Sequence, residues 1–548
     1  MEESPTQVIK FLQGKHFLHK TVLPDRCLDL FLTLHNRFHT QLLTLIQEKE
    51  VMLRQFDQGL IPLKPPSPSD KDAHPWQCEP YPINLQRRQV EITAPPLRKQ
   101  VVNALNAGAD VFMADFDDAL SPTWPNVLGG HYNLIKAIRR NLRFYDTDKR
   151  KEYAVMEINS QIFIQPRSLG REEGHMLVEG LPVSATLFDL AVYAFHNYVN
   201  LTEKLGQNCY FYIPKVDTLE EANFWNEMLS FLEQQLKAPA NSFKITFVVE
   251  SVLALSQLEE IVFALKERLV GLNTGRWNYI GSVVKRFRNF PSSQIEARHS
   301  LSNEASFLQA FQSQILNIAH KRGIHAIGGT SSFVPRENQP KLTEYAISQV
   351  ISEKTKEAEL GFDGAWVVHP LLVQPVAQCF AEIITHGQHQ KDRLLDEFEC
   401  DTVDQLFPFI NFRAGELLTD DFIIDKEEVK NAARVCLIYY FHWLKGTGAF
   451  SFDNLMEVAS TVEICRAQLW IWGNQRQRMK EGEQPPVNLE QEVMNEIIGK
   501  ETGKISTHDK LTLLQAKNLL KNLTRMKELP ESFLELAYPI LDKHQAKL

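Results

Sequence analysis

Residues 107–124 read AGADVFMADFDDALSPTW, and this stretch decides the fold. Its first half contains a short apolar run, ADVFMAD, which ends at Asp115 and is followed by the acidic pair Asp117 and Asp118. A short apolar run of this kind is consistent with a buried strand of a parallel sheet. The stretch therefore predicts a strand that delivers carboxylates at its carboxyl end.

The same pattern recurs over residues 95–375, where short apolar, β-branched runs alternate with amphipathic helical stretches. Such alternation predicts βα units and a parallel sheet. We expect further strands in IFIQPR, CYFYIPK, ITFVVE, HAIGG and AWVVHP, which end at Arg167, Lys215, Glu250, Gly329 and His369, and another in NYIGS, which starts at Asn278.

Two architectures place ligands at the carboxyl ends of parallel strands, the (β/α)8 barrel and the doubly wound open sheet. The barrel is favoured because seven or eight units fit into about 280 residues and no GxGxxG turn is present. We predict an α/β fold with a TIM (β/α)8 barrel over residues 91–380. A helical segment with a Pro-rich arm precedes it over 1–90, and a C-terminal helical domain follows over 381–548.

Composition narrows the functional class. The 548 residues are 44% hydrophobic and 23% charged, with a net charge of −9, which argues against a nucleic-acid-binding surface. No apolar run approaches the roughly 18 residues of a membrane helix. Seven scattered cysteines without CxxC spacing fit reduced thiols in an intracellular protein. The final Ala-Lys-Leu is close to a peroxisomal address, which predicts a peroxisomal location in a eukaryote and a cytoplasmic one otherwise.

Six motifs resemble one family in order and spacing. They are EITAPPLRKQVVNALNAGADVFMADFDDALSPTW (91–124), LFDLAVYAFHNY (187–198), GLNTGRWNYI (271–280), AHKRGIHAIGG (319–329), DGAWVVHP (363–370) and EICRAQLWIW (463–472). Over almost its full length the chain resembles malate synthase of the shorter A type. The resemblance implies a TIM barrel with a C-terminal helical plug. It also implies condensation of acetyl-CoA with glyoxylate and thioester hydrolysis to malate, the glyoxylate-cycle reaction, with Mg²⁺ as cofactor.

The resemblance assigns Arg167, in QPRSLG, to the family's catalytic arginine. That arginine stabilises the enolate formed when the acetyl methyl group loses its proton, as a fixed cation aimed at developing negative charge. The family continues with Gly, Trp or Leu, and His, whereas Ser168, Leu169 and Gly170 follow here. The alternative interpretation is a surface or salt-bridged arginine.

Two positions match the family's magnesium ligands. Glu250 corresponds to the first ligand, and Asn278 stands where the family has an aspartate. Mg²⁺ is usually bound by one or two carboxylates together with substrate and waters. An amide oxygen can coordinate the ion but brings no charge, so weakened or absent Mg²⁺ binding is expected. Alternatively, Asn278 is only a hydrogen-bonding residue at the end of the barrel.

The family's general base is an aspartate directly after Leu-Met-Glu, and the matching position here is Val458. Valine cannot accept a proton, so the base is lost at this position. Nearby acids are Asp453, Glu457 and Glu463. On a helix Glu457 would point about 100° away from position 458 and Glu463 would lie more than one turn on, so both are interpreted as structural acids.

Other positions match the family. The binding loop for the substrate carboxylate comprises Asn273, Thr274, Gly275, Arg276 and Trp277, in which Gly275 permits close backbone approach. Asp117 and Asp118 match an acidic pair that orients the ligands or the base, with solvated loop charges as the alternative. His369 and Pro370 end the last strand as in the family, and Thr330 replaces a methionine after Gly328-Gly329.

The departures from the family pattern, at Asn278, at Val458 and in the loop after Arg167, lie at positions assigned to the reaction, whereas the framework motifs are intact. Two hypotheses remain. In the first, the chain is a malate-synthase-type acyltransferase that is slow, or retuned to a related acyl-CoA or 2-oxo acid with a different base. In the second, it is a catalytically inactive binding or scaffold protein that still holds acyl-CoA or a small dicarboxylate. Neither hypothesis involves nucleic acid or membrane.

Overall fold

A closed barrel of eight parallel strands forms the centre of the molecule. The computed structural model describes residues 9–12, 16–61, 76–147, 150–289, 298, 305–336, 338–395, 426–474, 489–500 and 506–545. The strands follow one another around the barrel in chain order: β2 (Val90–Ala94), β3 (Val111–Asp115), β6 (Gln161–Gln165), β9 (Tyr210–Ile213), β10 (Lys244–Val249), β11 (Leu269–Thr274), β12 (His325–Gly328) and β13 (Gly364–Val367). Ala365 of β13 lies opposite Val90 of β2 and closes the ring, so the predicted TIM barrel is confirmed.

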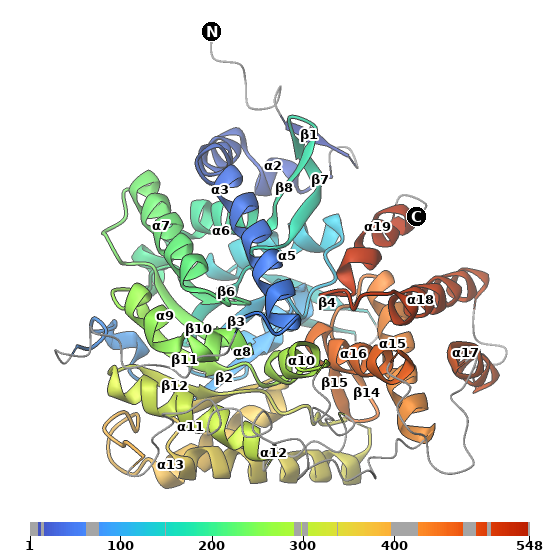
Figure 1. Cartoon of the computed structure of the whole chain (residues 1–548). Helices are drawn as coiled ribbons and strands as arrows, with labels where there is room; N and C mark the ends of the chain where they lie inside the picture. The colour runs from blue at the N-terminus through green and yellow to red at the C-terminus, as the bar shows by residue number, and fades with distance from the viewer. Residues whose placement is uncertain are drawn as a thin grey trace.

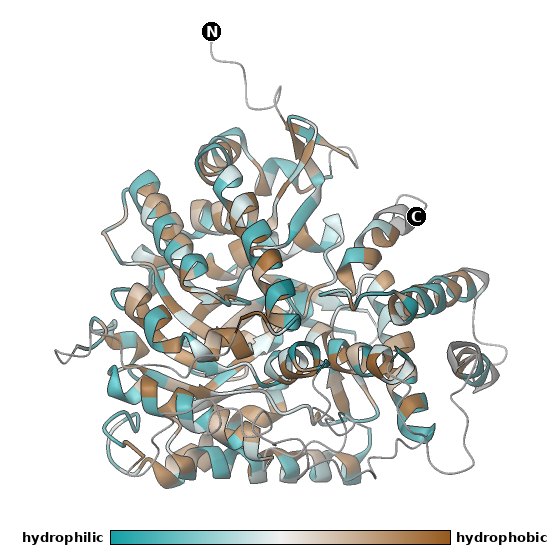
Figure 2. Cartoon of the chain, in the orientation of Figure 1, coloured by the Kyte–Doolittle hydropathy of each residue, from teal (hydrophilic) through white to brown (hydrophobic). Residues whose placement is uncertain are grey.

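Helices surround the barrel, as Figure 1 shows. They are α4 (Arg98–Leu105), α5 (Trp124–Ile138), α6 (Ala185–Asn200), α7 (Leu219–Leu236), α8 (Val252–Ser256), α9 (Leu258–Leu265), α10 (Arg276–Arg286), α11 (Ser306–Lys321), α12 (Pro340–Leu360) and α13 (Val373–Ile383). Several begin with side-chain caps, among them α7, where Thr218 and Glu221 form a capping box. Hydrophobic and hydrophilic residues alternate along these helices in Figure 2, the pattern of amphipathic helices that bury one face against a sheet.

One predicted strand is wrong. NYIGS, expected to start a strand at Asn278, lies inside α10, and the sixth barrel strand is β11, whose sequence is LVGLNT. The strand ends at Thr274, and Gly275 is the N-cap residue of α10. Asn278 therefore reaches the site from the first turn of a helix.

The N-terminal helix α3 (Asp25–Asp57) packs against α6 and α7. The helical spacing predicted up to Gln58 matches it. The short helix α2 (His19–Val22) precedes it, and most of the Pro-rich arm lies outside the described residues. Two small antiparallel sheets lie outside the barrel: β1 (Ile9–Phe11), β7 (Glu172–Val178) and β8 (Leu181–Ser184) form one, and β4 (Arg143–Asp146) with β5 (Lys151–Ala154) forms the other.

The C-terminal region is helical and has its own hydrophobic core. It contains α15 (Lys426–Leu444), the hairpin β14 (Phe450–Phe452) and β15 (Leu455–Glu457), α16 (Ala459–Asn474), α17 (Leu489–Lys500), α18 (Thr507–Arg525) and α19 (Leu534–Gln545). α16 packs along α10 of the barrel, which brings residues 456–461 to the carboxyl ends of the strands. The final Ala-Lys-Leu lies outside the described residues. Across the described ranges, no helix is long and apolar enough to cross a membrane.

Candidate functional site

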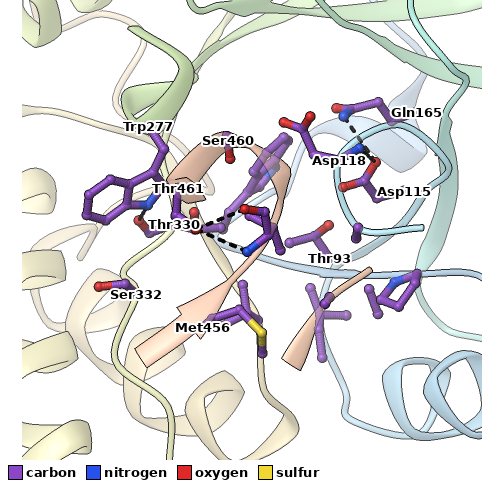
Figure 3. Close-up of a pocket in the computed structure, with 18 of the residues that line it drawn as sticks. Thr93, Asp115, Asp118, Gln165, Trp277, Thr330, Ser332, Met456, Ser460 and Thr461 are labelled. Carbon is purple, nitrogen blue, oxygen red and sulfur yellow. Dashed lines mark hydrogen bonds between the residues drawn. The ribbon is translucent and has the colours of Figure 1, made fainter. Parts of the chain in front are cut away.

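A cavity of about 270 Å³ lies between the carboxyl ends of the barrel strands and the start of α16. Its polar walls come from both: Asp115 and Gln165 end two strands, Asp118 follows the first of them, and Ser460 and Thr461 come from α16. In Figure 3, Asp115, Gln165 and Asp118 lie on one side of the cavity, and Trp277 and Thr330 lie on the other. The site therefore requires both the barrel and the C-terminal region.

The predicted binding loop forms one wall of this cavity. Thr274, Gly275, Arg276 and Trp277 all line it, whereas Asn273 is fully buried behind them within β11. A Cβ at Gly275 would come within 2.5 Å of Cβ of Glu250, so only glycine fits. Among the described residues no side chain caps the N-terminus of α10, and an uncapped helix N-terminus is a favourable place for an anion.

Arg276 and Trp277 are fixed at the rim of the cavity. The Arg276 guanidinium stacks 4.3 Å from the Trp277 ring centroid, and both side chains donate to the carbonyl of Thr330, Arg276 Nη2 at 3.3 Å and Trp277 Nε1 at 3.2 Å. Thr330 therefore joins this wall to the loop after β12.

An acidic cluster forms the opposite part of the wall. The Lys215 ammonium ion-pairs with Asp117 and with Asp118 Oδ1, the latter at 2.6 Å. Asn278 Nδ2 donates to Asp118 Oδ2 and to Glu250 Oε2, each at 2.7 Å. Burial works against the charge on Lys215, but Asp117 and Asp118 raise its pKa overall, so it stays an ammonium ion. Burial, together with the charge of Asp118, raises the pKa of Glu250 to about 8.

Asp115 and Gln165 lie deeper in the cavity. Asp115 Oδ1 accepts from the backbone N–H groups of Asp117 and Asp118 at 2.9 and 3.1 Å, and from Gln165 Nε2 at 3.2 Å. Burial, with the nearby carboxylates, raises the pKa of Asp115 to about 7. Because Asp115 accepts from the amide nitrogen of Gln165, Gln165 Oε1 is left as a buried acceptor with no partner among the described residues.

The family models and the sequence relatives that match this chain agree on one family. Residues 161–407 match the family model of the malate synthase TIM barrel domain, and residues 423–541 match that of the malate synthase C-terminal domain. The chain is 33% identical over 474 residues to malate synthase from Dictyostelium discoideum, with 84% of each chain covered. It is 31% identical over 523 residues to malate synthase from Arabidopsis thaliana, covering 94% of this chain and 91% of the relative.

The chain belongs to the malate synthase family. A solved structure of Haloferax volcanii malate synthase, a pyruvate/acetyl-CoA ternary complex, is also similar, with 13% identity, 78% of this chain and 97% of that chain covered, and a TM-score of 0.44. Membership of this acyltransferase family establishes the fold of the chain. Its activity depends on the residues that line its own cavity.

Arg167, the predicted enolate-stabilising residue, does not line the cavity. Its guanidinium donates to Asp189 twice, from Nε at 3.0 Å and Nη2 at 2.8 Å, and to Glu173 from Nη1 at 2.6 Å. The side chain is only 3% exposed. In this arrangement Arg167 is a buried ion-paired residue, the alternative considered from the sequence.

Gln165 is the residue of this strand that the sequence reasoning missed. β6 ends at Gln165 because Pro166 has no N–H to continue the ladder, so Gln165, not Arg167, is the last side chain directed from this strand into the cavity. The proline within IFIQPR was the available signal. Among the lining residues that the structure describes, Arg276 is the one arginine or lysine, and it is held at the rim.

Val458 lines the cavity, as do Ser460 and Thr461. It is not on a helix: Glu457 ends β15 and α16 begins at Ala459, which corrects the helical geometry assumed for the neighbouring acids. Glu457 is ion-paired with Arg298 at 2.5 Å and Glu463 with Arg466 at 2.6 Å. Neither acid lines this cavity, and nor does Asp453.

The residues at the predicted metal position fit Mg²⁺ poorly. Glu250 and Asn278 are adjacent, but the amide of Asn278 turns its nitrogen, not its oxygen, toward the carboxylates. Within the described part of the chain, no group of three or more His, Cys, Asp or Glu residues is arranged to hold a metal ion. On the far side of this cluster lies a second cavity of about 310 Å³, which shares Asp118, Glu250 and Asn278 with the first.

Proposed function

We propose that this member of the malate synthase family binds acyl-CoA and a small 2-oxo acid such as glyoxylate, but runs the condensation to malate slowly or not at all. The observation that carries the proposal is the composition of the cavity wall. The binding loop from Thr274 to Trp277 is retained, whereas Val458 stands at the position of the base and Gln165 ends the strand where an inward cation is needed.

The binding half of the proposal rests on the N-terminus of α10. Its uncapped N–H groups, next to Gly275 and Arg276, suit the carboxylate of a 2-oxo acid. The apolar side chains of Ile92, Val248 and Met456 line the same cavity and suit the uncharged part of a ligand. Ligand carboxylate and acyl group would thus meet beside Val458.

The catalytic half of the proposal rests on two groups that the described wall of the cavity does not provide at the expected positions, a general base and an inward-facing cation. Proton abstraction from an acetyl methyl group needs a carboxylate within reach, and loss of a general base costs about 10²–10⁴ in rate. The enolate needs a preorganised cation or donor, and loss of one such group costs about 10²–10³. Arg167 is held by Asp189 and Glu173 and supplies no charge to the cavity in this arrangement.

A retuned enzyme is the second candidate, and Asp115 favours it. This carboxyl lines the cavity, and its pKa of about 7 is close to the value that suits a general base near neutral pH. In that case the acyl donor or acceptor differs from that of the malate reaction. The base would then be Asp115 on β3, whereas the base of the malate reaction stands at the position of Val458, in the C-terminal region.

Calorimetric titration tests the binding proposal. Glyoxylate and CoA are expected to bind the native chain, and Gly275→Ala is expected to abolish glyoxylate binding, because its Cβ would displace Glu250 or the start of α10. Gly170→Ala is the matched control, since a Cβ there meets nothing within 4 Å, and it should bind normally. If neither ligand binds the native chain, both candidates are wrong.

A further inference from the structure

We propose that the carboxamide of Asn278 takes the place of the metal ion: it crosslinks Asp118 to Glu250, makes ligand binding independent of divalent cations, and can be converted into a magnesium site by Asn278→Asp alone. The inference goes beyond the proposed function, because it concerns what holds the acidic cluster together whether or not the chain turns over.

The orientation of the amide is fixed by its neighbours. Nδ2 of Asn278 lies 2.7 Å from Asp118 Oδ2 and 2.7 Å from Glu250 Oε2. Carboxylate oxygens accept hydrogen bonds, and of the two ends of the amide only the NH₂ group donates. Both of its hydrogens are therefore used, one on each carboxylate, and a single nitrogen joins the two acids.

The remaining oxygens of the two acids also have donors. Asp118 Oδ1 is paired with the Lys215 ammonium at 2.6 Å, and Glu250 Oε1 accepts from the backbone N–H of Lys215 at 2.5 Å. Each of the four carboxylate oxygens thus receives a hydrogen bond from either Asn278 or Lys215. A magnesium ion bound by both acids would have to replace the bonds from Asn278, and it would also have to be stripped of part of its hydration shell.

The backbone around the cluster is fixed in support of this arrangement. Lys215 follows β9 after one intervening proline and adopts a left-handed backbone conformation, with φ of 54°; its N–H donates to Glu250. On the other side of Glu250, Gly275 packs so closely that a Cβ would lie 3.2 Å from Oε2. Glu250 is therefore held between two backbone segments and cannot swing away to accept a different partner without moving one of them.

Charge explains why the substitution converts the site. In Asn278→Asp the two N–H donors disappear and a third carboxylate joins Asp118 and Glu250, with Lys215 as the adjacent cation. Like charges in a buried cluster repel, and a divalent cation relieves the repulsion. Three oxygen ligands from one helix, one loop and one strand end then provide the carboxylates that Mg²⁺ prefers.

The test is titration with MgCl₂ by calorimetry and by thermal unfolding, with no substrate present. The native chain is expected to show no binding heat and no shift of its thermal midpoint. Asn278→Asp is expected to have a lowered midpoint in EDTA, to regain it with Mg²⁺, and to bind the ion at least about tenfold more tightly than the native chain, the scale of effect seen when the surroundings of a metal site change.

Two controls separate a metal site from added negative charge. Asn278→Ala removes the crosslink without adding charge, so its midpoint should fall but should not recover with Mg²⁺. Ser282→Asp adds a carboxylate one turn further along α10, beside the second cavity, and should not gain Mg²⁺ binding. Mg²⁺ binding by the native chain that is abolished in Glu250→Gln would overturn the proposal, even if Asn278→Asp fails to fold. So would a folded Asn278→Asp protein that does not bind Mg²⁺.

Discussion

Replacing Arg167 by alanine distinguishes a structural arginine from a catalytic one. The side chain forms three hydrogen bonds to two carboxylates, Asp189 and Glu173, both of which are fully buried. Arg167, with the hydrogen-bonded His131, holds the pKa of Asp189 at about 2, below its usual value, although burial alone would raise it. Arg167→Ala therefore leaves two buried acids without their cation.

The loss of stability in Arg167→Ala is large because both carboxylates are buried. Breaking a buried ion pair by removal of one partner costs about 3–5 kcal/mol, because the remaining charge is left uncompensated. Arg171 is the matched control: its side chain is 22% exposed and its contacts are long, 3.9 Å to Asp117 and 3.5 Å to Ser532. Arg171→Ala should cost less than about 1 kcal/mol.

Equilibrium unfolding in urea, followed by tryptophan fluorescence, measures both variants. The barrel transition should shift strongly for Arg167→Ala and little for Arg171→Ala. Calorimetry on the folded fraction should then show glyoxylate binding retained in Arg167→Ala. Equal stability of the two variants, together with lost ligand binding in Arg167→Ala, would refute the structural role and restore Arg167 as a substrate contact.

Two further predictions concern carboxyls of the cavity. Burial raises the pKa of Glu250 to about 8 from a value near 4.5, so between these pH values the native state holds a proton that the unfolded state releases. The free energy of unfolding should therefore fall as the pH rises from about 4.5 to about 8, by at most about 1.4 kcal/mol per pH unit. Thermal midpoints across this range should show a fall that is reduced in Glu250→Gln; identical pH profiles would contradict the assignment. If the retuned enzyme is correct, Asp115→Asn should abolish turnover of an acyl-CoA while leaving CoA binding in calorimetry intact, and unchanged turnover would exclude Asp115 as the base.

The barrel was predictable from the sequence because most of its strands are short apolar runs that can be recognised locally. Buried strands such as ITFVVE are mostly apolar, and in a parallel barrel their carboxyl ends must meet at one face. The position of Glu250 in the cavity followed directly. NYIGS failed because five residues with two apolar side chains, Tyr279 and Ile280, do not distinguish a strand from the first turns of a helix, and the helix is set by the Gly275 turn before it.

The site was predictable only in part, since side-chain direction depends on tertiary partners. The sequence placed Arg167 at a strand end, but Asp189 and Glu173, which hold it away from the cavity, come from α6 and β7. The bonds from Asn278 to Asp118 and Glu250 join residues 160 and 28 positions apart. No periodicity or spacing reveals such contacts.

The most direct test of the account is the rate at which the native chain releases CoA thiol from acetyl-CoA with glyoxylate, measured with and without Mg²⁺. Without a base at Val458 or an inward cation at Gln165, we expect a rate at least about 10⁴-fold below the typical enzyme range of about 1–10³ s⁻¹. The triple variant Gln165→Arg, Asn278→Asp, Val458→Asp should gain Mg²⁺-dependent thiol release. Turnover of the native chain within the ordinary enzyme range would contradict the account.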